Sequence, residues 1–192
     1  MVLYVARHGQ TLWNVERRVC GASDVELTET GLAQARQMAE EAEGKAVGLI
    51  LSSPLKRALV TAQIAADRLG LKVYVDPRLA EQNYGIFEGA DRDDPAFLEA
   101  KRQFAARPPQ GESILDVAAR VYSLLDELAE RRLSENALIV AHGGVCRLIH
   151  SYFISMTRDE FASYSPENCQ LEPYCLSVRS GRPDGRTTRL GG

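Results

Sequence analysis

Short apolar runs alternate with longer segments of helical periodicity along this chain, and that alternation constrains the fold most strongly. A short run of aliphatic residues is typical of a buried strand, whereas apolar residues three and four positions apart indicate the inner face of a helix. The predicted strands are 2–6, 47–51, 72–75, 137–141 and 174–179. Strands that alternate with helices favour a mainly parallel sheet with helices on both faces, so we expect an α/β fold of the three-layer α/β/α type.

Residue types that start and end helices lie between the predicted strands. The predicted helices span about 28–43, 53–70, 95–105 and 145–154, with two more that begin at 113 and 157. Thr28, Ser113 and Thr157 are expected to cap three of them. Ser53-Pro54 is expected to supply the cap and the first residue of the second helix, and Gly44 to end the first.

A chain of 192 residues is expected to form one domain, residues 1–192, with a substantial core. The segment at about 76–112 is polar and contains many Pro, Asp and Arg residues. Such a segment is typical of a lid-like insertion over the edge of a sheet. Near the end of the sequence, Arg182 to Gly185 predicts a turn that returns a last strand.

Composition narrows the classes of partner. The net charge of -3 gives no overall attraction for nucleic acid or for an anionic membrane surface. No apolar run reaches the length of a membrane span. The four cysteines form no C-x-x-C pair, and the first residues show no signal-peptide pattern. A cytoplasmic location is therefore expected. The three histidines lack the spacing of metal ligands, and we expect neither a metal nor another cofactor.

Two of the predicted strands end in the same way, with a histidine and then a glycine. They are the stretches Leu3–Gly9 and Leu138–Gly144. In open α/β sheets ligands collect beyond the carboxyl ends of strands, so His8 and His142 on neighbouring strands would point into one crevice. A single histidine in such a place more simply bonds a backbone carbonyl, but the pair favours a shared site.

Two arginines are candidates for binding an anion at this edge. Arg7 directly precedes His8, and Arg57 lies in the first turn of a predicted helix, where free N–H groups attract negative charge. A guanidinium can hold two phosphate oxygens at once. For Arg57 a solvated surface charge is the alternative. Gly9 and Gly143-Gly144 would let the backbone approach a ligand closely.

These residues also carry a family resemblance. The stretch from Arg7 to Asn14, R-H-G-Q-T-L-W-N, resembles the R-H-G-E-T-x-W-N signature of the histidine phosphatase superfamily, whose fold is phosphoglycerate mutase-like. Further similar segments follow in the family's order at 24–35, 53–62, 81–89, 110–113 and 140–143. Together these matches span about three quarters of the chain. Gln10 and Glu26 depart from the pattern, where Glu and Pro are commoner, but both lie outside the charge-handling positions.

The resemblance implies a role for each matching position. His8 would be the nucleophile, and Glu81 would donate and then accept the proton, with Glu88 and Glu112 open as alternatives. The implied catalytic residues are Arg7, His8, Arg57, Glu81 and His142. The implied substrate-binding residues are Arg7, Asn14, Gly21, Arg57, Glu112, His142 and Gly143.

The chemistry of a phosphohistidine enzyme sets further expectations for these side chains. Imidazole attacks phosphorus only when it is neutral, and two adjacent arginines lower the pKa of His8 by disfavouring imidazolium. Glu81 must be protonated before the attack, which calls for partial burial. Covalent catalysis of this kind needs no metal.

The resemblance favours the phosphatase branch. We therefore expect a metal-independent phosphomonoesterase that hydrolyses small phosphorylated metabolites through a phosphohistidine on His8. Gln82 stands where the mutases have an arginine, and a short lid would admit water. Cys20-Gly21 and Tyr84-Gly85 resemble the mutase branch, so a cofactor-dependent phosphoglycerate mutase stays an alternative, as does a non-catalytic phosphate-binding module. No nucleic-acid or membrane partner is expected, and a homodimer is left open.

Overall fold

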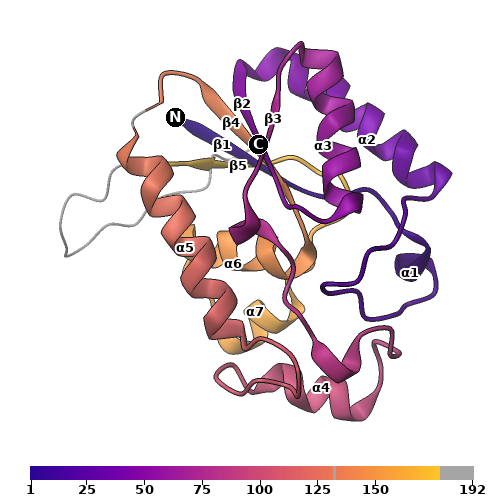
Figure 1. Ribbon diagram of the computed structural model, residues 1–192. Helices are drawn as coiled ribbons and strands as arrows, with labels where there is room; N and C mark the ends of the chain where they lie inside the picture. The colour runs from indigo at the N-terminus through magenta and orange to yellow at the C-terminus, as the bar shows by residue number, and fades with distance from the viewer. Residues whose placement is uncertain (132, 178–192) are drawn as a thin grey trace.

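The computed structural model describes residues 1–131 and 133–177, which form a sheet with helices on both sides (Figure 1). The strands are β1 (Val2–Arg7), β2 (Val47–Ser52), β3 (Val73–Val75), β4 (Asn136–Ala141) and β5 (Glu172–Cys175). The α-helices are α1 (Leu12–Val15), α2 (Glu29–Ala42), α3 (Lys56–Leu69), α4 (Pro95–Arg102), α5 (Ile114–Glu130), α6 (Gly143–Phe153) and α7 (Arg158–Ser163). Short 3₁₀ turns occupy Glu43–Lys45, Pro77–Leu79 and Gly85–Phe87.

The sheet has the strand order β3-β2-β4-β1-β5. The pairs β2–β3, β2–β4 and β1–β4 are parallel, and only the edge strand β5 runs antiparallel to its neighbour β1. This arrangement confirms the prediction of a mainly parallel sheet. Arg7 lies opposite Ala141 in the register of β1 and β4, so both strands end at the same level.

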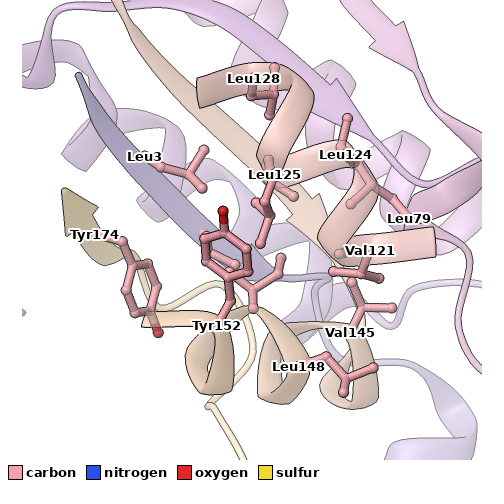
Figure 2. Packing of buried hydrophobic residues seen from close by; sticks show 14 of the residues in the cluster. Leu3, Leu79, Val121, Leu124, Leu125, Leu128, Val145, Leu148, Tyr152 and Tyr174 are labelled. Atoms are coloured by element: carbon pink, nitrogen blue, oxygen red, sulfur yellow. The ribbon is translucent and has the colours of Figure 1, made fainter. Parts of the chain in front are cut away.

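Alternate residues of β4 face opposite sides of the sheet, and each side has its own core. Ala137, Ile139 and Ala141 pack in the cluster formed with α5 and α6. Figure 2 shows other members of this cluster, among them Leu125 and Val145. Leu138 and Val140 pack in the cluster formed with α2 and α3. Because side chains alternate along a strand, the central strand is buried on both faces. The three-layer α/β/α arrangement is therefore confirmed.

Three helix starts agree with the sequence prediction. The hydroxyls of Thr28, Ser113 and Thr157 accept hydrogen bonds from backbone N–H groups in the first turns of α2, α5 and α7. Each such cap is worth about 1 kcal/mol relative to alanine. The cap at Ser113 also marks the end of the lid segment, because α5 follows that segment directly.

Two helix-boundary predictions are wrong. Helix α3 begins at Lys56, with Leu55 at its N-cap and no side-chain cap, and the hydroxyl of Ser53 contacts the N–H of Leu55 and Nε2 of His142. Helix α2 ends at Ala42, and a 3₁₀ turn carries the chain past Gly44. The reversal comes at Ala46, whose φ of 49° is left-handed.

The last described strand starts earlier than predicted, at Glu172, and ends at Cys175. The predicted turn at Arg182 to Gly185, and the end of the predicted strand at 179, lie outside the described residues. Within residues 1–131 and 133–177, no helix combines the length and the apolar character needed to cross a membrane.

Candidate active site

The parallel register of β1 and β4 places the two strand-end histidines side by side. The backbone N–H of His8 donates to the carbonyl of Ala141 over 2.9 Å, which continues the ladder by one residue. The ring centroids of His8 and His142 lie 5.2 Å apart. Both rings are buried, with 3% of His8 and 0% of His142 exposed. The structure thus brings together the two imidazoles that the strand pattern pairs.

Hydrogen bonds fix the proton position on His8. Its Nδ1 atom lies 2.7 Å from the carbonyl oxygen of Gly9, which can only accept, so Nδ1 carries the proton. The other nitrogen, Nε2, accepts a hydrogen bond from Nε of Arg57 over 3.2 Å. The lone pair of His8 is therefore on Nε2 and faces the Arg57 guanidinium.

Arg57 is a buried cation, with 1% of its surface exposed, so the surface-charge alternative is wrong. Besides His8, its guanidinium donates to the carbonyls of Gly21 and Ser23 at 2.7 and 2.6 Å. These contacts use three of the five N–H donors of a guanidinium. In the described part of the chain no carboxylate pairs with Arg57, although a buried unpaired charge costs several kcal/mol.

Two further nitrogens beside this site have no partner among the described residues. They are Nε of Arg7 and Nδ1 of His142. The hydroxyl of Ser53 accepts from the N–H of Leu55 and lies 2.7 Å from Nε2 of His142, to which it can donate. With the hydroxyl as the donor of this bond, the proton of His142 is on Nδ1, which is then an unused donor. Buried donors without a protein acceptor are available to water or to an anion.

Burial and charge together keep both histidines neutral. Burial contributes most, followed by the charges of Arg57 and Arg7, and they hold the pKa of His8 well below 6.5. Burial, Arg57 and the neighbouring His8 lower the pKa of His142 in the same way. The sequence predicts that the pKa of His8 is lowered and that the arginines contribute, but burial is the larger cause.

Glu81 lines the same pocket as His8, and only 6% of its surface is exposed. Its two oxygens accept hydrogen bonds from the N–H groups of Gln82 and Gly144, each over 2.9 Å. A Cβ atom at Gly144 would lie 2.5 Å from one of these oxygens, so glycine allows the close approach. The carboxyl group is thereby held at the start of α6, near His142.

The two alternative acids are held in other places. Glu88 accepts hydrogen bonds from the N–H groups of residues 21–23, the hydroxyl of Ser23 and the N–H of Tyr84. Glu112 accepts from the N–H of Asn83 and pairs with Arg120. Neither carboxylate lines the pocket of Glu81.

The pocket has a volume of about 230 Å³. Its lining includes the predicted residues Arg7, His8, Asn14, Glu81 and Gly143. Gly21 contributes its carbonyl to Arg57 and is not part of the lining. Within the described residues no group of three or more His, Cys, Asp and Glu side chains is placed to hold a metal ion.

Several residues of the site are not among those predicted from the sequence. Ser53, which bonds His142, directly follows β2, a neighbour of β4, and that position is a usable signal. Asn168 donates to the carbonyl of His8 and has no comparable signal. The cations Arg92, Lys101 and Arg147 also line the pocket, although they lie outside all the recognised motifs.

Comparison with known proteins agrees with this geometry. The chain is 35% identical over 176 residues to the probable phosphoglycerate mutase GpmB of Yersinia pestis (strain Pestoides F), covering 88% of this chain and 82% of the relative. A solved mycobacterial glucosyl-3-phosphoglycerate phosphatase in complex with VO3 is 34% identical, with a TM-score of 0.80 and coverage of 91% and 90%. A phosphoserine phosphatase from Entamoeba histolytica in complex with 3-phosphoglyceric acid is 25% identical, with a TM-score of 0.78 and coverage of 91% and 90%.

The sequence model of the histidine phosphatase superfamily (branch 1) matches residues 3–186, which is nearly the whole chain. The matched range contains both strand-end histidines, Arg57 and Glu81. Together with the relatives and the solved structures, this match shows that the chain belongs to the histidine phosphatase superfamily.

Proposed function

We propose that this protein is a metal-independent phosphomonoesterase that hydrolyses small phosphorylated metabolites through a phosphohistidine on His8. The observation that carries the proposal is the buried Arg57 guanidinium, which has no carboxylate partner among the described residues and touches a neutral histidine. A phosphate group supplies the missing negative charge, and Nε2 of His8 supplies the lone pair.

In the first step Nε2 of His8 attacks phosphorus, the N–P bond forms and the ester P–O bond breaks. The Nε–H of Arg57, which donates to Nε2 at rest, turns to a phosphoryl oxygen as the lone pair is used. The free donors of Arg7 and His142 stabilise the other oxygens. Glu81 gives its proton to the departing alkoxide.

In the second step water attacks phosphorus on the side that the alcohol has left. Glu81 takes a proton from this water, the N–P bond breaks, and inorganic phosphate leaves. The proton stays on Nδ1 of His8 throughout, donated to the Gly9 carbonyl, so the imidazole returns to its starting tautomer.

Hydrolysis is favoured over phosphoryl transfer between positions of phosphoglycerate. Gln82 stands at the mutase arginine position, so the positive charge that would bind a carboxylate is missing there, and one of its two amide N–H donors is already used by the carbonyl of Glu112. The two solved relatives named above are phosphatases, whereas the curated relative is a probable mutase. The mutase is therefore the second candidate.

The deciding assay compares phosphate release from a panel of phosphomonoesters with interconversion of 2- and 3-phosphoglycerate in the presence of 2,3-bisphosphoglycerate. We expect phosphate release that survives a metal chelator and is inhibited by vanadate. Interconversion that is much faster than release would replace the proposal by the mutase, and a strict need for a divalent metal would overturn it.

A structural prediction concerns Glu88, which connects the lid to the loop that holds Arg57. Glu88→Gln replaces an acceptor of five hydrogen bonds by an amide whose NH₂ group cannot accept them. We expect a loss of about 1–3 kcal/mol of unfolding free energy. Because the Gly21 and Ser23 carbonyls move with the loop, kcat should fall about equally on aryl and alkyl phosphates.

Thermal unfolding and steady-state kinetics check this expectation. Glu99→Gln is the matched control, because Glu99 is an exposed acid on α4 whose side chain is 60% accessible. The expectation fails if Glu88→Gln behaves like this control, or if it selectively removes activity on alkyl phosphates.

A further inference from the structure

Three cationic side chains line the pocket without belonging to the phosphate site around His8. Arg92 and Lys101 come from the lid segment, on and just before α4, and Arg147 comes from α6. The motifs that carry the family resemblance include none of them. Segments that are far apart in the sequence thus bring three like charges to one cavity.

Among the described residues, none of these cations has a carboxylate within ion-pair distance. Arg92 donates to the carbonyl of Arg18 over 3.1 Å, and Arg147 donates to the carbonyl of Tyr164 over 2.9 Å. The ammonium of Lys101 lies 5.6 Å from the ring centroid of Phe97. Across residues 1–131 and 133–177, no carboxylate forms an ion pair with any of the three.

The wall of the pocket is therefore strongly positive. With Arg7, four cationic side chains line it, whereas Glu81 is the only carboxylate among the described lining residues. Both Glu81 oxygens already accept backbone hydrogen bonds. This local excess contrasts with the net charge of -3 for the whole chain.

The charges are close enough to act on one another. Burial, then Arg147 and Arg92, lower the pKa of Lys101. Burial and then Arg92 lower the pKa of Arg7. Like charges that lie close together in a partly buried pocket destabilise the folded protein unless an anion compensates them. A phosphate at His8 would be neutralised by Arg7 and Arg57. The remaining three cations would then need a second negative group to compensate their charge.

We propose that Arg92, Lys101 and Arg147 form a subsite for a second anionic group on the alcohol part of the substrate. The inference rests on the proposed function, and it restricts the substrates to phosphomonoesters that carry a further carboxylate or phosphate. The pocket of about 230 Å³ is smaller than typical sites for drug-sized ligands, which fits a small metabolite with its two anions close together.

The test uses three substrates with a common glycerol-derived skeleton. Glycerol 3-phosphate has an uncharged alcohol part, 3-phosphoglycerate adds a carboxylate, and glycerol 1,3-bisphosphate adds a phosphate. We expect kcat/KM to be higher for one or both of the doubly anionic substrates by about 10- to 100-fold, mainly through KM. The preferred member of the pair identifies the second group as a carboxylate or a phosphate.

Variants connect this preference to the cluster. Lys101→Met and Arg92→Met should each reduce the preference about tenfold or more, because each removes one charge-assisted contact. Arg102→Gln is the matched control, since Arg102 also lies on α4 but is exposed and faces Glu99. This control should keep the wild-type preference.

The outcomes separate the subsite from the proposed function. Equal kcat/KM on all three substrates would overturn the subsite proposal, and so would an equal loss on all three in Lys101→Met. In both cases the release of phosphate would still support the phosphatase proposal. If no substrate releases phosphate, the phosphatase proposal fails, and calorimetric binding of the same three compounds to the full chain then decides the subsite. Tighter binding of a doubly anionic compound supports it, and equal affinities overturn it.

Discussion

Replacing His8 by alanine should lower phosphate release by roughly 10⁴-fold or more, because the side chain supplies the bond to phosphorus. His142→Ala should cost less, about 10²- to 10³-fold, because it removes one donor to the phosphoryl oxygens. The difference follows from the surroundings of the two rings. Nε2 of His8 presents a lone pair, whereas Nε2 of His142 is bonded to Ser53 and only its Nδ1 has no protein partner.

The covalent intermediate distinguishes the two histidines directly. Enzyme that is quenched in alkali during turnover should carry phosphate on His8, as read by peptide mass spectrometry. His142→Ala should still be labelled at His8, and His8→Ala should carry no label. Circular dichroism and thermal unfolding show whether each variant is folded. Phosphate on another residue, or near-normal turnover by folded His8→Ala, would remove the basis of the proposed mechanism.

The sequence predicts the pairing of His8 and His142 because parallel strands have a simple geometry. Two strands that each end in histidine and glycine put both rings at one edge when they are neighbours, and β1 and β4 are neighbours. The same logic gives the position of Arg57 after β2. It does not give the burial of Arg57 or the dominant effect of burial on the pKa of His8, since both depend on packing across the layers.

Other parts of the site have no signal in a single sequence. Glu88 bonds mainly to backbone N–H groups, which every residue but proline carries, so its partners in the 21–23 loop have no particular residue type. Ser53 has the residue type of a helix cap, but its hydroxyl bonds His142. Arg92 and Lys101 lie in the lid, where no periodicity predicts which side chains face the pocket.

The second large effect is expected at Glu81. Glu81→Gln keeps the shape of the side chain but cannot donate a carboxyl proton, so an alkyl phosphate must leave as an unprotonated alkoxide. We expect about 10²- to 10⁴-fold lower kcat/KM on alkyl phosphates and a change within about tenfold on 4-nitrophenyl phosphate, whose leaving group needs little protonation. The pattern is measured with both substrates under identical conditions.

Gly144→Ala offers an independent way to disturb the same carboxyl group. The added Cβ would lie 2.5 Å from a Glu81 oxygen and must displace it, without changing any titratable side chain. This variant should therefore reproduce the selective loss on alkyl phosphates. Glu112→Gln is the control for the alternative acid, and it should affect both substrate classes alike because Glu112 pairs with Arg120 outside the pocket lining. A selective loss in Glu112→Gln, together with an equal loss in Glu81→Gln, would move the proton donor from Glu81 to Glu112.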